Sequence, residues 1–121
     1  MVVAIQNINY FLYMYEKDKG IVNKASWLKK AIVTLYALVR RQGVQQGAYY
    51  STKKALAKLE DLRKRSDEIL EKAINNPDLS LSLILEVDKI ADEFVEVWVG
   101  TAYDVVPLED TIEAFMKSQA L

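Results

Sequence analysis

The residues best suited to binding chemistry in this 121-residue chain are cations, and they are concentrated in its middle third. Between residues 21 and 65, eleven lysines and arginines stand against two acids, a balance of +9. Between residues 66 and 121, three bases stand against thirteen acids, a balance of −10, and the whole chain carries −1. A locally basic surface attracts polyanions whatever the net charge of the protein. The sequence therefore predicts an electrostatic binding surface for a chain of phosphates.

The spacing of these cations gathers them on helix faces. At about 100° per residue, an arc of roughly 120° on one helix holds four cations over about 16 Å: Lys29, Lys30, Arg40 and Arg41. On the following helix a narrow stripe holds Lys54, Lys58 and Arg65, and a neighbouring stripe holds Lys53 and Lys64. If the two helices pack as an antiparallel pair, the stripes merge into one basic band. Such a band would reach a few consecutive phosphates of a nucleic-acid strand.

The link between these helices, "VRRQGVQQGAYYSTKK" at residues 39–54, adds polar and aromatic groups. Its glutamines can donate to phosphate or sugar without reading base sequence. Tyr49 or Tyr50 can stack on an unpaired base, a contact worth roughly 1–3 kcal/mol. A solvated helix face with core tyrosines is the competing interpretation. The predicted nucleic-acid-binding residues are Lys29, Lys30, Arg40, Arg41, Gln45, Gln46, Lys53, Lys54 and Lys58.

The composition argues against catalysis. The chain has no histidine and no cysteine, which removes the standard zinc sites, the serine and cysteine triads and the di-iron bundle pattern. Its four glycines match neither nucleotide-binding fingerprint. The acids fall on helix faces in ways that solvation explains. We therefore expect a protein that is not an enzyme and that uses no metal or cofactor.

Apolar residues recur every three or four positions nearly throughout, which predicts an all-α protein. We expect a compact bundle of about five helices in a single domain spanning residues 1–121. The helices are expected from about Ala4 to Glu16, from Asn23 or Ser26 onward, from Ser51 or Thr52 to the turn at 75–78, from Leu79 to Thr101, and from Pro107 to Ser118. The second helix either stops at Gly43 or continues to Tyr50, with Gly47 as a close-packing point.

Nothing in the sequence predicts a membrane protein. No uncharged run approaches the length that a bilayer requires. The first twenty residues are apolar in part but lack a basic leader. We therefore expect a soluble, cytoplasmic protein with no membrane partner.

The acidic half of the chain has two interpretations. The fourth expected helix carries an acidic cluster away from its apolar stripe: Glu86, Asp92, Glu93 and Glu96. Solvation explains this cluster adequately. Alternatively, the acidic face of one copy meets the basic face of another in a head-to-tail contact that propagates along a filament.

The stretch "LVRRQGVQQGAYY", Leu38 to Tyr50, resembles a segment of the small all-helical subunit of CRISPR effector complexes, in the Cmr branch of type III or a related CRISPR small subunit. The matching positions are Arg40, Gly43, Val44, Gln46 and Tyr50. A cationic helix precedes the segment and a lysine-rich stretch follows it. A tryptophan-bearing helix also lies near the C-terminus in that family, where Trp98 stands here.

The resemblance implies a role in antiviral defence. Small subunits of that family carry no catalytic residues and contact the backbone of the guide–target duplex beside other subunits of a ribonucleoprotein complex. The first phosphate contacts implied here are Lys29, Lys30, Arg40 and Arg41, with Gln45, Gln46, Lys53, Lys54 and Lys58 in support.

An alternative hypothesis is a helical protein-interaction module or a coat-like assembly subunit, for example an archaeal viral one. Its interface would be the aromatic-rich first helix, with four anchors: Tyr10, Phe11, Tyr13 and Tyr15. Detection of bound nucleic acid would separate this hypothesis from the first.

Overall fold

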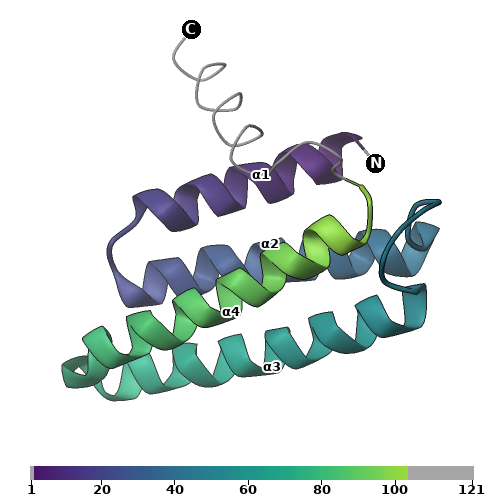
Figure 1. Ribbon diagram of the computed structural model, residues 1–121. Coiled ribbons are helices and arrows are strands. Elements are labelled where there is room, and N and C mark those ends of the chain that lie inside the picture. The colour runs from purple at the N-terminus through teal and green to yellow at the C-terminus, as the bar shows by residue number, and fades with distance from the viewer. Residues whose placement is uncertain (1, 104–121) are drawn as a thin grey trace, which may run out of the picture.

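The computed structural model describes residues 2–103 as a bundle of four long α-helices (Figure 1). The elements are α1 (Val2–Lys17), α2 (Ile21–Gln42), α3 (Thr52–Asn75), a short 3-10 helix η1 (Pro77–Leu79) and α4 (Ser80–Gly100). The predicted all-α class is confirmed. Within this described part the bundle has four α-helices rather than about five. The helix predicted from Pro107 to Ser118 lies outside the described residues.

Successive helices run antiparallel, and α2 is the central element of the bundle. It packs against α1, α3 and α4, while α3 also packs against α4. In Figure 1, α4 lies in front of the bundle and α2 behind it. One end of the molecule holds the start of α1, the α2–α3 loop and the end of α4, and it is called the loop end below.

The core forms where the apolar stripes of the four helices meet. On α2, Leu28 and Leu35 are fully buried, and they belong to one hydrophobic cluster with Leu59 of α3 and the large rings of Phe94 and Trp98 on α4. Burial of each such side chain contributes roughly 1.5–3 kcal/mol relative to exposure. The three- and four-residue spacing read from the sequence therefore corresponds to one continuous core.

Helix α2 ends at Gly43, the earlier of the two boundaries considered from the sequence. Gly43 adopts a φ of 73°, and its N–H donates to the carbonyl of Val39 at 2.7 Å. Helix α3 then starts after Ser51, whose side chain accepts from Lys54 N–H at 3.2 Å, as an N-cap does. Gly47 has a φ of 82° and nothing within 4 Å of the position that a Cβ would occupy. It is therefore a turn residue and not a close-packing point.

The α2–α3 loop is attached to the end of α4. The N–H of Gln45 donates to the carbonyl of Thr101 at 3.0 Å, and the N–H of Tyr50 donates to the carbonyl of Gly100 at 3.0 Å. The hydroxyl of Tyr103 donates to the carbonyl of Gly43. A Cβ at position 100 would overlap the ring of Tyr50, so Gly100 is the glycine at which a close approach requires the absence of a side chain. These contacts fix the loop as an ordered part of the loop end.

Candidate nucleic-acid interface

Four exposed cations gather at the loop end. Arg40 and Arg41 end α2, and Lys53 and Lys54 begin α3. The two helix ends are joined by a hydrogen bond from the N–H of Val44 to the side-chain oxygen of Thr52, 3.2 Å long. Within residues 2–103, none of the four cations forms an ion pair with a carboxylate. Arg40, Arg41, Lys53 and Lys54 are called the loop-end cluster.

The two halves of this cluster lie at opposite ends of a helix dipole. Arg40 and Arg41 lie in the last turn of α2, where the helix dipole favours positive charge. Lys53 and Lys54 lie in the first turn of α3, which has no acidic residue to complement the positive end of the dipole. Because both side chains are exposed, each cation is destabilising by about 0.3–0.5 kcal/mol, the lower end of the range for charges at helix ends. An unfavourable charge at a helix end that no neighbouring acid offsets is typical of a functional site.

Two further polar groups of the loop lie beside the cluster. Gln46 is exposed. Tyr49 is 89% exposed, and its ring meets the ring of Tyr50 edge-on with centroids 5.3 Å apart. Tyr50 itself is half-buried against Gly100. Tyr49 therefore offers an exposed ring in the loop between the cations, while Tyr50 holds the loop in place. Gln45 is half-buried, and its N–H is bonded to the carbonyl of Thr101, directly after α4.

The other two predicted cations of α2 lie toward the opposite end of the helix. Lys29 pairs with Asp67 of α3 at 2.7 Å, and Asp67 also accepts from Arg63 at 2.9 Å. Lys30 lies over the ring of Trp27, 4.5 Å from its centroid. Because the carboxylate of Asp67 sits between α2 and α3, the two basic stripes do not merge into a continuous band.

Lys58, the last of the predicted cations, faces α4 instead of α2. Glu93 of α4 accepts from Lys58 at 3.3 Å and from Arg65 at 2.6 Å. The hydrogen bond from Arg65 is the main reason that the pKa of Glu93 lies below its ordinary value, and Lys58 adds to the effect. Glu93 therefore belongs to the seam between α3 and α4, and the acidic cluster predicted on the solvent face of α4 does not include it.

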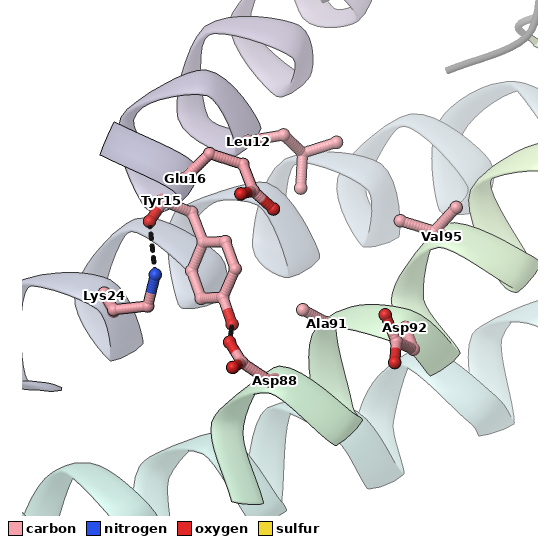
Figure 2. A pocket seen from close by; sticks show the side chains of 8 residues that line it. All are labelled: Leu12, Tyr15, Glu16, Lys24, Asp88, Ala91, Asp92 and Val95. Atoms are coloured by element: carbon pink, nitrogen blue, oxygen red, sulfur yellow. Dashed lines mark hydrogen bonds between the residues drawn. The ribbon is translucent and has the colours of Figure 1, made fainter. Parts of the chain in front are cut away.

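A second polar site lies between α1, α2 and α4 (Figure 2). It is a hollow of about 370 Å³ lined by Leu12, Tyr15, Glu16, Lys24, Asp88, Ala91, Asp92 and Val95. The hydroxyl of Tyr15 donates to the carboxylate of Asp88, and Lys24 Nζ donates to the carbonyl of Tyr15 at 2.8 Å. Burial, followed by the bond to Asp88, raises the pKa of Tyr15 above its ordinary value. These groups satisfy one another and join α1 to α4.

The tyrosines of α1 are therefore used differently from the interface predicted for them. Tyr15 is only 3% exposed and cannot anchor a partner from the surface. Tyr10 and Phe11 pack on Trp27 of α2, with ring centroids 5.9 Å and 6.1 Å away. Most of this aromatic segment fixes α1 to the rest of the bundle. The bond between Tyr15 and Asp88 spans 73 positions, so helical periodicity gives no signal for it.

For the part of the chain that the structure describes, fold and site together define a class of protein: an antiparallel four-helix bundle whose loop end carries a cationic cluster without internal ion pairs and an exposed tyrosine. In residues 2–103, no three side chains of His, Cys, Asp or Glu are grouped so that they could hold a metal ion. None of the helices in that range has the length and apolar composition to cross a bilayer. Comparison with protein-family models, with curated proteins and with solved structures gave no match.

Proposed function

We propose that this chain is a non-catalytic subunit that binds nucleic acid by gripping the sugar–phosphate backbone with its loop-end cluster. One observation carries the proposal: four exposed cations that form no ion pair with any carboxylate in residues 2–103 lie at the two helix ends joined by the loop that carries the exposed ring of Tyr49. A phosphate that binds Arg40 or Lys53 displaces no internal ion pair. Binding at Lys29 or Lys58 would compete with Asp67 or Glu93.

The chemistry of the cluster suits a flexible strand. The guanidinium groups of Arg40 and Arg41 can each donate two parallel hydrogen bonds to a phosphate. Lys53 and Lys54 add compact charges, and Tyr49 can stack on an unpaired base. Contacts to phosphate carry no sequence information, so the proposed binding is tolerant of sequence.

The resemblance to the small subunits of CRISPR effector complexes supports a role for this surface in an assembly. The residues that carry the resemblance lie in the last turn of α2 and in the loop: Arg40, Gly43, Val44, Gln46 and Tyr50. In this proposal the chain is a cytoplasmic small subunit of a ribonucleoprotein complex and contacts guide or target RNA beside other subunits.

The salt dependence of binding tests the proposal. Four phosphate contacts on a single strand predict that log K falls with log salt with a slope of about −2.8. Affinity for a labelled single-stranded RNA should then fall about fiftyfold between about 50 and 200 mM salt. Fluorescence anisotropy measures this directly, with single-stranded DNA and an RNA–DNA hybrid as further probes. Absence of binding at low salt, or affinity that does not change with salt, would refute the proposal.

The alternative of a coat-like assembly subunit is favoured by one observation, the exposure of Leu81 and Leu85 on α4. Light scattering and the ratio of absorbance at 260 and 280 nm separate the two functions. Assembly of a purified protein that binds no nucleic acid even at low salt favours the coat-like subunit, whereas assembly alone is compatible with both functions. Copurifying nucleic acid that high salt removes favours the backbone-binding subunit.

A further inference from the structure

The solvent face of α2 is a shallow trough between α1 and α3. Two hollows of about 460 and 280 Å³ adjoin along the helix, and both are lined by Val33 and Thr34. Val33 is 45% exposed although it is apolar. Lys30 borders the first hollow and Arg41 borders the second, so a cation lies beside each hollow. This surface, with its floor at Val33, Thr34 and Ala37, is called the α2 trough.

The solvent face of α4 has the complementary character. Leu81 and Leu85 are 74% and 68% exposed. At about 100° per residue they share an arc of about 60° with Asp92 and Glu96. Neither acid forms an ion pair within the described part of the chain. These four residues are called the α4 ridge.

The trough and the ridge lie on opposite sides of the molecule. Helices α2 and α4 pack against each other across the core, so their solvent faces point away from one another (Figure 1). A contact between the ridge of one copy and the trough of another is therefore heterologous. It leaves one trough and one ridge free at the two ends, and further copies can add there.

We propose that a second copy of this chain occupies the α2 trough, with its α4 ridge docked against Val33, Thr34 and Ala37. The charges and the spacing both support this occupant. Leu85 and Asp92 are seven residues apart, as are Thr34 and Arg41, which is about 10 Å along each helix. Helices α2 and α4 run in the same direction within one copy, and the docked helices are parallel in this proposal. When Leu85 of one copy rests on Thr34 of the next, Asp92 then lies level with Arg41. Arg40, Lys53 and Lys54 stay available to a nucleic-acid backbone, and the contact does not depend on the proposed function.

Sedimentation velocity of nucleic-acid-free protein at several concentrations tests the contact. The weight-average mass of the wild type should rise with concentration beyond that of a dimer. Ala37→Glu places an acid in the trough, where Arg41 four residues later compensates it within α2. Leu85→Lys alters the ridge at an exposed position. We expect each variant to lose the concentration dependence, while Glu71→Lys, a charge reversal at an exposed position of α3, retains it.

A mixture of the two variants gives a sharper result. The Ala37→Glu variant keeps an intact ridge and the Leu85→Lys variant keeps an intact trough. An equimolar mixture should therefore form a one-to-one dimer that does not grow. Circular dichroism checks the fold of each variant, and Leu81→Lys replaces Leu85→Lys if the latter loses helicity. A wild type that stays monomeric at every concentration, or a mixture without dimers, would overturn the proposal.

Discussion

The two lysines at the start of α3 should affect stability and binding in opposite directions. Lys53 and Lys54 lie at the positive end of the helix dipole, with no acid in the first turn. Replacing both by glutamine removes the unfavourable charges and keeps good helix formers in place. We expect the free energy of unfolding to rise by about 0.5–1 kcal/mol for the pair. The melting temperature should rise by about 2–5 °C in a domain of this size.

The same change should weaken the binding of nucleic acid. Loss of two of the four phosphate contacts halves the salt slope for a single strand, from about −2.8 to about −1.4. At physiological salt each lost contact lowers affinity about fourfold, so the Lys53→Gln, Lys54→Gln variant should bind about fifteenfold more weakly. A more stable protein that binds less well cannot be explained by damage to the fold.

The assay pairs fluorescence anisotropy on a labelled single strand with thermal and urea unfolding of the same samples. The matched control is the Lys64→Gln, Lys89→Gln variant, which lowers the net charge equally at two exposed positions outside the loop-end cluster. It should retain most of the affinity. The reasoning is wrong if both pairs lose affinity equally, since net charge alone would then control binding. It is also wrong if the Lys53→Gln, Lys54→Gln variant is less stable than the wild type.

Three further changes have defined outcomes. Tyr49→Ser should weaken binding to a single strand about ten- to a hundredfold, because the stacking contact is lost. The melting temperature should not change, because the ring is solvent-exposed. An unchanged affinity would exclude stacking at this position. Gly100→Ala should lower the free energy of unfolding by about 1–3 kcal/mol, as measured by urea unfolding, because the added methyl group overlaps the ring of Tyr50. Wild-type stability would show that the ring moves aside freely. The raised pKa of Tyr15 means that the folded protein favours the neutral phenol. The contribution of Tyr15 to stability should therefore be constant below the ordinary value of 10.0 and fall as the pH rises above it. Tyr15→Phe should remove that part of the alkaline slope, as measured by urea unfolding across pH.

Local patterns in the sequence were sufficient to predict most of the fold. The three- and four-residue spacing of apolar side chains predicted the helices, because each helix buries one face. The position of Gly43 predicted a possible end of α2, and Ser51 or Thr52 predicted the start of α3, where the structure has Ser51 as the N-cap. Sequence alone did not choose between Gly43 and Tyr50 as the end of α2. In the structure the loop after Gly43 bonds to Gly100 and Thr101, far along the chain, and the ring of Tyr50 packs against Gly100.

The candidate site was predicted in part. The sequence placed Arg40 and Arg41 on one basic helix face and Lys53 and Lys54 on stripes of the next helix, and in the structure these four lie at the end of α2 and the start of α3. It also grouped Lys29, Lys30 and Lys58 with them, whereas the structure engages these three elsewhere. Lys30 meets Trp27, three residues earlier on the same face of α2. The partners of Lys29 and Lys58 lie on other helices, and no spacing rule identifies which acid on another helix a cation will meet.

The sequence by itself determined the helical class, the number of charges and the arc that each charge occupies on its own helix. All of these follow from the residue types and their spacing along the chain. Only the tertiary structure decided which charges remain unneutralised, because Asp67 and Glu93 reach Lys29 and Lys58 across the packed helices. Neutralisation depends on contacts a few ångströms long between segments 35 or more positions apart, and the packing of the core places those segments side by side.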